Sequence, residues 1–346
     1  MANIQDVAKL AGVSISTVSR VLNGTAYVNP DVELRVQEAM QKLQYQPNRA
    51  ARALRANYSR IIGLLITDIQ NPFFTALIRG VEDVAQSKGY SVILCNSDEN
   101  AHKEQQYIEV LCAEHVAGSI VAPTREQVQI LKPFQEQSIP VVLVDRSIKK
   151  SGCDAILVNN RQGAYEAVTH LIENGYRRIG IVCGPLKTTT GRERLAGYRQ
   201  ALQDAGYAPD PLLERIGSFK EESGEKLTNE LLELEEPIDA LFTCNNLMTL
   251  GALNAIQKRE LRIPDNIAIV GFDEMPWATL SSISLTTVTQ PVYDLGSTAA
   301  LRLFQRLENP TTFNGQEIIL SPRLTLRKSS SPRGQNLTDS VELSPL

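Results

Sequence analysis

The chain has 346 residues, of which 42% are apolar and 21% are charged, and this composition predicts a globular protein with enough apolar material for two or three cores. It has no run of 18 apolar residues, and Asp6 and Lys9 stand where a secretory signal needs an apolar stretch, so we expect a cytoplasmic protein without a transmembrane helix. Five widely spaced cysteines without a C-x-x-C motif, and three histidines without metal-ligand spacing, argue against a disulfide framework and against a metal site.

The net charge of −4 conceals an asymmetry between the N-terminal arm and the rest of the chain. Residues 1–60 hold two Lys and six Arg against two Asp and two Glu, a balance of +4, so the remaining residues sum to −8. A basic arm on an acidic body is typical of a polyanion-binding module fused to another domain, although +4 over 60 residues is also compatible with ordinary scatter.

Residues 3–24 predict two short helices joined by a tight turn. Asn3 can cap the first helix, Gly12 permits the turn, and Ser14 can cap the second helix, which is expected to stop at Asn23-Gly24. A third helix is expected after Asn29, with proline at its first position. The apolar residues of the three helices fall on one side of each and predict a small core: Ile4, Val7, Ala8, Ala11, Val18, Val21, Leu22, Val32, Val36, Ala39, Met40 and Leu43.

The other face of the second helix is mostly polar, short-chained and basic. It carries Ile15, Ser16, Ser19, Arg20 and Asn23. A DNA backbone can approach such a face closely, Arg20 can reach toward guanine, and small hydroxyls suit phosphates and base edges, so this helix is a candidate for recognition in the major groove. The alternative is a three-helix domain that binds no ligand.

The segment PNRAARALRAN, residues 47–57, favours a helix but is short and has no apolar stripe to fold against. On a helical wheel Arg49, Arg52 and Arg55 form one stripe, and Leu54 points nearly opposite. An apolar wedge flanked by cations is the device of proteins that bend DNA from the minor groove, and a flexible, helix-prone linker is the alternative.

The body from residue 61 onward alternates short apolar runs with helical stretches. Strands are expected at 61–67, 91–95, 118–122, 140–144 and 155–158, and then within RRIGIVCG, IDALFTCN and IAIVGFD. This alternation predicts an α/β body of parallel sheets flanked by helices on both faces. About 265 residues with this many strands exceed one comfortable core, so two lobes are expected.

Ligands of parallel sheets bind beyond the carboxyl ends of the strands. The residues that follow the expected strands combine aromatic rings with Asp, Asn and Arg: Phe73, Phe74, Asp145, Arg146, Arg194, Phe219, Asn245, Asn246, Asp273 and Trp277. Carboxylates and amides hydrogen-bond hydroxyls while rings cover C–H faces, so this set suits a compact ligand rich in hydroxyls. Each residue also has a structural alternative, as a core aromatic or a helix cap.

The segments IQDVAKLAGVSISTVSRVLNG and LQYQPNRAARALR resemble the DNA-binding arm of the lactose-repressor (LacI/GalR) family of bacterial regulators, and IGLLITDIQNPFF, RLAGY and VGFDE resemble motifs of its body. The resemblance covers nearly the whole chain. It implies an all-α helix-turn-helix arm joined to a two-lobed body like the periplasmic sugar-binding proteins. It also implies a hinge helix that folds in the minor groove, where Leu54 wedges into the central base step.

Two sets of contacts follow from the resemblance together with the residue patterns. The residues expected to contact DNA are Ser14, Ile15, Ser16, Thr17, Ser19, Arg20, Asn23, Tyr45, Asn48, Arg49, Arg52, Leu54 and Arg55. The residues expected to contact the effector are Phe73, Phe74, Asp145, Arg146, Arg194, Phe219, Asn245 and Asp273. Two departures from the family pattern matter. Asn246 replaces a common Asp, and Thr188 replaces the basic residue of purine-sensing members, which favours a sugar over a purine.

The resemblance also implies the organisation of the chain and its partners. We expect a helix-turn-helix domain at 1–46, a hinge at 47–60, and a body at 61–328 whose lobes comprise about 61–160 with 291–321 and 161–290 with 322–328. The Ser/Pro-rich segment 329–346 is expected to be disordered and has no leucine heptad, so a homodimer is expected. The expected partners are a pseudo-palindromic double-stranded operator in the bacterial nucleoid and a small-molecule effector, with no cofactor and no membrane.

Enzymatic alternatives find little support in the motifs. GPLKTTTGR has six residues between its glycines, whereas a phosphate loop needs four, and no G-x-G-x-x-G or G-x-S-x-G is present. A sugar hydrolase using Asp145 and Asp273, or a sugar-binding transport component, each with an unrelated basic arm, are the alternatives to a ligand-responsive transcriptional regulator.

Overall fold

The computed structural model describes residues 2–23, 27–45, 59–275, 278, 284–309 and 315–332. These residues belong to two compact units, an N-terminal unit up to Ser59 and a body from Arg60 onward. The expected hinge contacts Asn48, Arg49, Arg52, Leu54 and Arg55, and also Trp277, lie outside the described residues. No helix in the described ranges is long and apolar enough to cross a bilayer.

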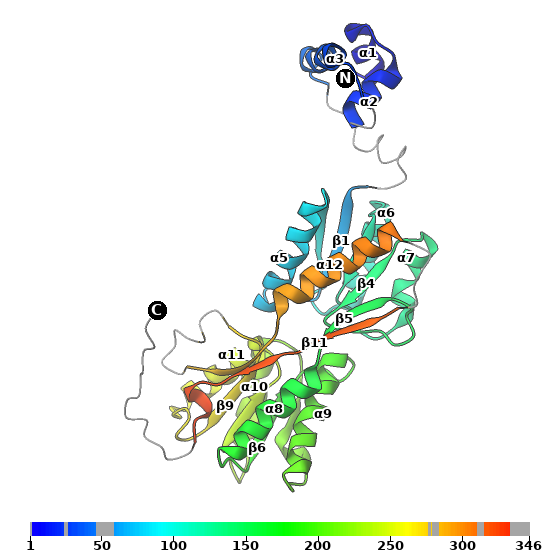
Figure 1. Cartoon of the computed structure of the whole chain (residues 1–346). Helices are drawn as coiled ribbons and strands as arrows, with labels where there is room; N and C mark the ends of the chain where they lie inside the picture. The colour runs from blue at the N-terminus through cyan, green and yellow to red at the C-terminus, as the bar shows by residue number, and fades with distance from the viewer. Residues whose placement is uncertain are drawn as a thin grey trace. The chain divides into compact units, whose positions relative to one another are not determined.

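The N-terminal unit contains the three expected helices, α1 (Ile4–Ala11), α2 (Ile15–Asn23) and α3 (Pro30–Lys42), as Figure 1 shows. Asn3 closes a capping box with Asp6, and Gly12 ends α1 in the left-handed conformation at φ 66°. The Ser14 hydroxyl accepts a hydrogen bond from the Thr17 N–H at 3.1 Å, which caps α2 as expected. These local signals confirm the predicted helix-turn-helix arrangement.

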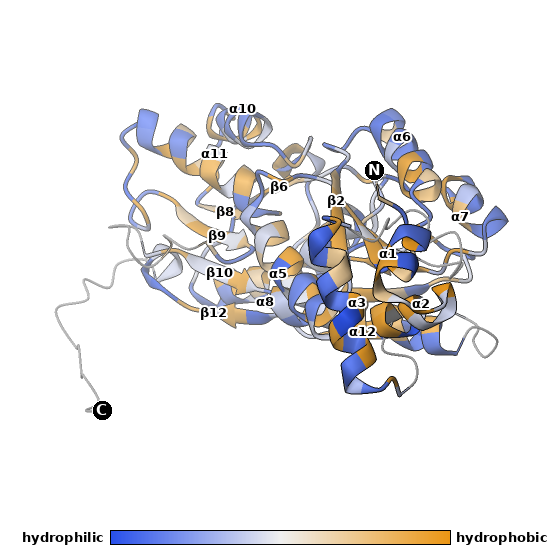
Figure 2. Cartoon of the chain, turned by 90° about the horizontal axis from the view of Figure 1, so that it is seen from above, coloured by the Kyte–Doolittle hydropathy of each residue, from blue (hydrophilic) through white to orange (hydrophobic). Residues whose placement is uncertain are grey.

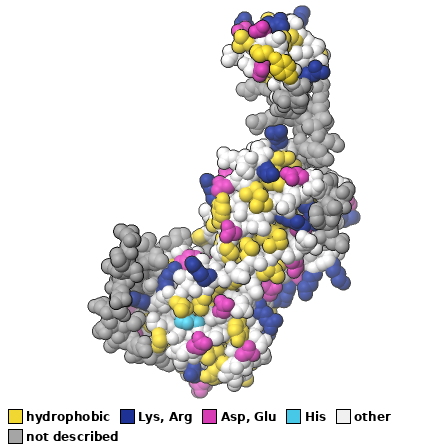
Figure 3. All heavy atoms as spheres, in the orientation of Figure 1, with side chains coloured by type: hydrophobic (Ala, Val, Ile, Leu, Met, Phe, Trp, Pro, Cys, Tyr) yellow, Lys and Arg dark blue, Asp and Glu magenta, His cyan; other side chains and the backbone are white. Residues whose placement is uncertain are grey.

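A small apolar core holds the three helices together. Val7 and Ala11 of α1, Val18 of α2, and Val36 and Ala39 of α3 are buried in it. Hydrophobic side chains are also exposed on this unit, as Figure 3 shows for one face, and Ile15 is among them. Because α2 packs into the core through Val18, its polar face lies outside the core.

Lobe 1 of the body is built on a six-stranded sheet whose strands are all parallel, in the order β11-β5-β4-β3-β1-β2. Two helix layers cover it, α5 and α12 on one face, and α6 and α7 on the other. The strands are β1 (Ile61–Ile66), β2 (Ser91–Asn96), β3 (Gly118–Val121), β4 (Val141–Val144), β5 (Asp154–Val158) and β11 (Glu317–Leu320). The helices are α5 (Pro72–Ser87), α6 (Ala101–Ala113), α7 (Lys132–Glu136) and α12 (Val292–Glu308), with a 3-10 turn at Val128–Leu131.

Lobe 2 repeats this plan in the order β12-β10-β9-β8-β6-β7, but its strand β12 runs antiparallel to β10. Helices α8 and α9 cover one face, and α10 and α11 cover the other. The strands are β6 (Ile179–Cys183), β7 (Glu214–Ile216), β8 (Ala240–Thr243), β9 (Ala268–Phe272), β10 (Thr286–Thr289) and β12 (Arg323–Thr325). The helices are α8 (Asn160–Glu173), α9 (Thr189–Asp204), α10 (Glu221–Leu232) and α11 (Asn246–Lys258), with 3-10 turns at Pro211–Leu213 and Lys328–Ser330.

Each lobe buries its sheet between amphipathic helices. The helices carry both hydrophobic and hydrophilic stretches in Figure 2, as expected for elements with one face on a core. Helices α5 and α12 approach closely because glycines face each other's backbone. A Cβ on Gly80 would lie 2.3 Å from the Tyr293 carbonyl oxygen, and one on Gly296 would lie 2.1 Å from that of Leu77. A larger residue at either position would force the two helices apart.

The chain passes between the two sheets three times. It leaves lobe 1 after β5, returns after β10 to form α12 and β11, and crosses again between β11 and β12. Because both sheets hold parallel strands that end toward the other lobe, the loops after those strands meet in a cleft. The predicted α/β fold with parallel sheets is confirmed.

Two details of the fold differ from expectation. Strands β7, β10, β11 and β12 were not expected, and three of them are half-exposed edge strands without a long apolar run. The expected tail begins at residue 329, yet Ser329 and Ser330 are fully buried. The Ser329 hydroxyl donates to the Ile269 carbonyl oxygen at 2.7 Å. The folded body therefore extends at least to Ser330, and a Ser-rich sequence gives no local sign of such long-range partners.

Candidate functional site

The cleft between the two lobes contains a cavity lined by all eight expected effector contacts. Of the two further residues that follow expected strands, Asn246 does not line it, and Trp277 lies outside the described residues. The volume of the cavity is about 30 Å³, far below the ~300 Å³ or more of most small-molecule sites. The lobes are thus closed on each other, and a ligand the size of a sugar needs them to part or their side chains to rearrange. The selected lining residues are Phe73, Phe74, Asp145, Arg146, Arg194, Phe219, Asn245 and Asp273.

Asp145 and Asp273 occupy matching positions in the two lobes. Asp145 directly follows β4, and Asp273 directly follows β9. Both have a left-handed backbone, at φ 65° and 79°, and this turn aims each carboxylate into the cleft. Burial raises the pKa of Asp145 to about 6, against the opposing effect of the nearby arginines. Burial likewise raises the pKa of Asp273. Both carboxylates lack solvent and can serve as strong hydrogen-bond acceptors.

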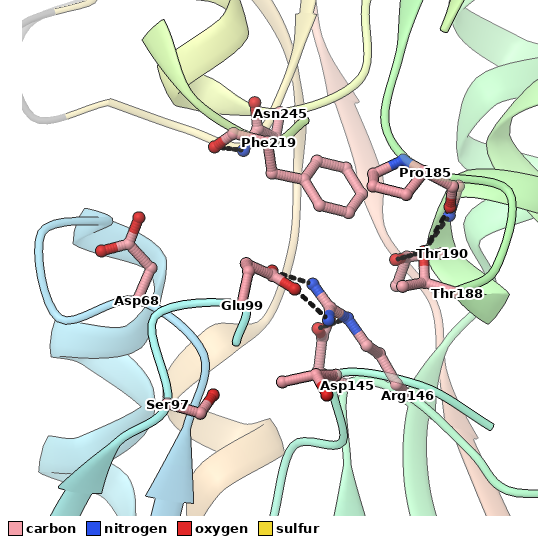
Figure 4. Close-up of polar contacts among 12 residues, drawn as sticks. Asp68, Ser97, Glu99, Asp145, Arg146, Pro185, Thr188, Thr190, Phe219 and Asn245 are labelled. Carbon is pink, nitrogen blue, oxygen red and sulfur yellow. Dashed lines mark hydrogen bonds and ion pairs between the residues drawn. The ribbon is translucent and has the colours of Figure 1, made fainter. Parts of the chain in front are cut away.

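Arg146 is held in the cleft by a two-pronged ion pair. Its terminal nitrogens donate to the carboxylate of Glu99 at 2.6 and 2.9 Å, as Figure 4 shows. One of them also donates to the Pro123 carbonyl oxygen at 3.1 Å. The guanidinium lies 5.3 Å from the centre of the Phe219 ring on the opposite lobe. This contact is within the range of a cation–π interaction.

Arg194 is anchored by neutral groups. Its Nε donates to the Asn160 side-chain oxygen at 2.7 Å, and one terminal nitrogen donates to the Cys244 carbonyl oxygen. Its guanidinium also stacks 3.7 Å from the centre of the Phe272 ring. These partners fix the guanidinium in a buried position, from which its charge opposes the rise that burial causes in the pKa values of Asp145 and Asp273.

Aromatic rings from both lobes form the apolar part of the cavity wall. Phe73 and Phe74, in the first turn of α5, pack edge to face at a centroid distance of 5.0 Å. Phe219 approaches from lobe 2, and its ring lies over Gly184, where a Cβ would come within 2.1 Å of it. A glycine at this position is therefore required for the ring to reach the cleft, where Figure 4 shows it.

Polar bridges join the lobes around the cavity. The Asn246 side-chain nitrogen donates to the Asn71 side-chain oxygen at 2.9 Å. Lys220 donates to Asp68 at 2.8 Å and to Asp98 at 2.7 Å. These contacts oppose separation of the lobes and stand where a hinge-bending motion would break them.

Several buried polar atoms at the cavity have no hydrogen-bond partner within the described part of the chain. Three belong to lining residues, Thr67 Oγ1, Arg146 Nε and Gln290 Oε1, and Asn246 Oδ1 belongs to a residue that bonds the lining residue Asn71. All four residues are at most 6% exposed, and Arg146 Nε has only an ion-pair contact with Asp145, at 3.5 Å. Unsatisfied buried polar groups are costly, so their concentration at one cavity suggests a polar ligand. The four include donors and acceptors, which matches a ligand whose groups both donate and accept.

Sequence reasoning missed six lining residues: Thr67, Asp68, Asn71, Glu99, Thr190 and Gln290. Asp68 and Asn71 lie in the segment that carries Phe73, and Glu99 follows β2, so a scan of every strand end would have found them. Thr188 does not line the cavity. It caps α9, accepting from the Gly191 N–H at 3.3 Å. Asn245 caps α11 through the Met248 N–H at 2.8 Å while also lining the cavity.

The expected DNA-contact face of α2 is largely solvent-accessible. Ser14, Ile15, Ser16 and Arg20 are exposed, and Thr17 and Ser19 are partly exposed. The Ser14 hydroxyl bonds the Ser16 and Thr17 hydroxyls at 2.7 and 2.9 Å, which orders the start of the helix. Tyr45 packs against the core of the N-terminal unit. The Asn23 side chain lies outside the described atoms, and its expected DNA contact stays a prediction.

No group of three or more His, Cys, Asp or Glu residues in the described part of the chain is placed to hold a metal ion. The cavity also lacks a nucleophile paired with a histidine, because its lining comprises Asp, Glu, Arg, Asn, Gln, Thr and Phe side chains. The arrangement suits binding, with many hydrogen bonds and stacked rings, more than bond cleavage.

Two family models match the chain. One, described as periplasmic binding proteins and sugar binding domain of LacI family, matches residues 59–327. The other, described as bacterial regulatory proteins, lacI family, matches residues 3–48. Together they cover the N-terminal unit and the body.

Individual proteins extend this similarity over most of the chain. The HTH-type transcriptional repressor PurR of Aliivibrio salmonicida is 37% identical over 310 residues, 89% of this chain and 93% of that protein. The ribose operon repressor of Halalkalibacterium halodurans is 38% identical over 308 residues, 89% and 91% of the two chains. The solved lac repressor dimer bound to operator and the anti-inducer ONPF is 28% identical with a TM-score of 0.84, covering 95% of this chain and 99% of that one.

Proposed function

The chain belongs to the LacI family of bacterial transcriptional repressors, with an N-terminal DNA-binding unit and an effector-binding body, and we propose that a sugar bound in the cleft sets its affinity for its operator. This membership sets aside the sugar hydrolase and the transport component as alternatives.

The observation that carries the sugar proposal is the mixture of unsatisfied donors and acceptors at the cavity. Arg146 Nε makes no hydrogen bond and lies 3.5 Å from an Asp145 carboxylate oxygen, so it can still donate to an acceptor. Gln290 Oε1, and Asn246 Oδ1 next to the lining, can accept from donors. A sugar hydroxyl both donates and accepts, so one ligand can satisfy both kinds of atom. The carboxylates of Asp145 and Asp273 add two strong acceptors, and the phenylalanine rings can cover the C–H faces of a sugar ring.

A purine is the second candidate, because several relatives are PurR repressors. Two features favour a sugar. Thr188 stands where purine-sensing members carry a basic residue, and its hydroxyl is used within its own turn, donating to the Pro185 carbonyl oxygen at 2.8 Å. The relative named as a ribose operon repressor shows that this level of identity includes sugar operons. Ribose is therefore the first sugar to test.

On the DNA side we propose a homodimer that reads a pseudo-palindromic operator. Twofold symmetry would place two α2 helices in successive major grooves, with Ile15, Ser16 and Arg20 toward the base edges. The proposed hinge residues would pair in the central minor groove, with Leu54 as the wedge and Asn48, Arg49, Arg52 and Arg55 on phosphates. The sugar would change the angle between the lobes, bias hinge folding, and so alter operator affinity by reciprocal linkage.

The direct test uses the full-length protein with a panel of sugars and nucleobases, first D-ribose and hypoxanthine. We expect D-ribose or another neutral sugar to raise the melting temperature in a concentration-dependent way and to change operator affinity in gel-shift titrations without being consumed. A stabilising nucleobase with no effect from any sugar would replace the sugar proposal by the purine one.

For the hinge, Leu54→Ala should weaken specific operator binding far more than non-specific binding, and equal losses would contradict the wedge.

A further inference from the structure

The inference concerns the electric charge of the ligand and rests on the proposed sugar function. Both guanidiniums that line the cavity are already partnered. Glu99 accepts one N–H from each terminal nitrogen of Arg146, and Asn160 with the Cys244 carbonyl accepts from Nε and one terminal nitrogen of Arg194. Arginine usually recognises a phosphate or carboxylate through two parallel N–H groups. In this cleft Glu99 already holds that pair of groups on Arg146, so an anionic ligand would have to displace it.

Glu99 is placed for this role by an unusual stretch of backbone. Asp98 and Glu99 both adopt left-handed conformations, at φ 53° and 56°, which non-glycine residues rarely do. The Glu99 N–H donates to the Thr67 carbonyl oxygen at 2.9 Å, which ties the loop to the end of β1. Strained backbone held by specific contacts is typical of functional sites. Here it turns the carboxylate of Glu99 toward the guanidinium of Arg146, as Figure 4 shows.

The other charges at the cavity act in the same direction. Four carboxylates line it, Asp68, Glu99, Asp145 and Asp273, against the two guanidiniums of Arg146 and Arg194. Lys220 offsets Asp68 but is shared with Asp98. Arg194 has neutral hydrogen-bond partners, but the carboxylates that line the cavity outnumber the guanidiniums. In a buried site of low dielectric, an additional negative charge would lose its hydration and meet more repulsion than attraction.

We propose that Glu99 sets the charge selectivity of the cleft. Glu99 takes one N–H from each terminal nitrogen of Arg146, the two that a phosphate would need together, and leaves the ligand only separate N–H donors of that arginine, which suit a hydroxyl oxygen. The cleft therefore accepts neutral sugars and rejects their phosphorylated forms. Glu99 is a positioning residue for Arg146, and it also supplies the charge that a phosphate would have to replace. The repressor thus responds to a free sugar before its phosphorylation and not to the product of that step.

The test measures binding of D-ribose and D-ribose 5-phosphate to the full-length protein by isothermal titration calorimetry, with D-glucose and D-glucose 6-phosphate as a second pair. Wild type should bind a neutral sugar at least about tenfold more tightly than its phosphate. Glu99→Gln frees the Arg146 guanidinium and should shift this ratio toward the phosphate by about tenfold or more. The matched control is Asp98→Asn, which removes the same charge from the adjacent residue without touching Arg146.

The outcomes separate this inference from the proposed function. Equal binding of sugar and phosphate by wild type, or binding of the phosphate alone, would overturn the selectivity even though the site binds a sugar derivative. The same shift in Asp98→Asn as in Glu99→Gln would show a general charge effect and remove Glu99 from its role. If Glu99→Gln does not fold, Glu99→Asp retains the charge, and loss of discrimination in that variant would also overturn the proposal. Absence of binding by every sugar and phosphate would instead contradict the proposed sugar function itself.

Discussion

The two lobes of the body share one strand order, but the polar side chains buried at equivalent strands differ in charge. Strand β5 of lobe 1 and strand β10 of lobe 2 hold equivalent places, each second from the edge of its sheet. Their first residues are Asp154 and Thr286, and both are fully buried. Asp154 holds α12 and the segment before β11 in lobe 1, and Thr286 holds the segment after β12 in lobe 2.

In lobe 1 the anchor is ionic. Asp154 accepts hydrogen bonds from Arg302 and Arg306 of α12, at 2.9 and 2.6 Å from their Nε atoms, and from the Gln316 N–H at 2.8 Å. Burial by itself raises the pKa of Asp154, but the hydrogen bonds from Arg306 and Arg302 outweigh it and lower the pKa to about 2. One carboxylate thus joins β5, α12 and the segment that leads into β11.

In lobe 2 the anchor is made of hydroxyls. The Thr286 hydroxyl bonds the Ser330 hydroxyl at 2.7 Å, and the Thr286 N–H donates to the Ser329 hydroxyl at 2.8 Å. The Ser330 hydroxyl also bonds His170 Nε2 at 2.8 Å. This network ties the last described residues of the body to the sheet without burying a full charge. The comparison teaches that topology specifies a buried polar anchor at this position but not whether that anchor is charged.

The largest effect is expected from breaking the ionic anchor. Asp154→Asn leaves two arginine side chains without their carboxylate in a largely buried setting, and we expect a loss of about 3–5 kcal/mol in the free energy of unfolding. Because the folded-state pKa is lowered to about 2, the stabilisation is fully present above the unfolded pKa near 3.8 and is lost as pH falls through 2. Urea unfolding of both proteins at pH 7 measures it. A loss below about 1 kcal/mol would show that the anchor is dispensable.

The next largest effect on the free energy of unfolding is expected at the two aspartates of the cleft. The pKa of Asp145 is raised by burial to about 6, so the folded protein binds a proton there that the unfolded chain releases near pH 3.8. The free energy of unfolding contributed by this group therefore falls as pH rises from 4 to 6, by about 3 kcal/mol. Asp145→Asn cannot ionise, so this variant does not lose stability in this way as pH rises. Its stability relative to wild type should rise between pH 4 and pH 7, as measured by urea unfolding.

Asp273→Asn sharpens the same comparison. The pKa of Asp273 is also raised by burial, so its variant should gain relative to wild type in the same direction as pH rises. A gain in one lobe with none in the other would show that the matching backbone positions do not impose matching electrostatics.

Local sequence signals sufficed where local physics decides the structure. The cap residues Asn3, Ser14 and Asn29 and the turn at Gly12 predicted the helices of the N-terminal unit, because capping depends on neighbouring backbone groups. The buried central strands were predicted because a continuous apolar run is visible in the sequence. The half-exposed strands β7, β11 and β12 were missed because their stability comes from pairing with distant strands.

The residues of the cavity were predicted where their position in the sequence sufficed, and their pairings with distant residues were not. Strand ends selected Asp145 and Asp273 because parallel strands bring their carboxyl ends together. A scan of every strand end would also have selected Glu99, but not its pairing with Arg146, 47 residues further along the chain. The partners of Asp154 lie 148 and 152 residues away. Pairings over such distances are set by the tertiary fold, and one sequence carries no local record of them.

A smaller effect is expected from the hydroxyl anchor of lobe 2. Thr286→Val keeps the shape of the side chain but removes the hydroxyl that serves Ser330 and the Arg327 N–H. We expect a loss of about 1–3 kcal/mol in the free energy of unfolding. Because no charge is created or removed, the loss should be the same at low and high salt. A loss as large as that of Asp154→Asn would erase the distinction between the two anchors.

The smallest effect concerns the ion pairs that join the two lobes through Lys220. Lobe 2 supplies Lys220, and lobe 1 supplies Asp68 and Asp98. Asp68 is buried, but Lys220 and Asp98 are 30% and 52% exposed, so solvent screens the charges and the interaction should be worth about 1 kcal/mol or less, or up to about fivefold in ligand affinity. Lys220→Gln should weaken binding of the sugar by that factor, because closure of the lobes loses an attraction. Calorimetric titration of the neutral sugar in low and high salt measures it.

The dependence on salt decides whether this pair acts between the lobes. Salt screens exposed charges over about 8–10 Å at physiological ionic strength, so wild type should bind a neutral sugar less tightly at high salt, and Lys220→Gln should lose most of that dependence. The matched control is Arg199→Gln, which removes an equal charge from a pair with Glu214 that lies wholly within lobe 2, at 2.6 Å. This control should keep the wild-type dependence on salt. If both variants lose it equally, the effect belongs to net charge, and the lobes are held together by their uncharged contacts alone.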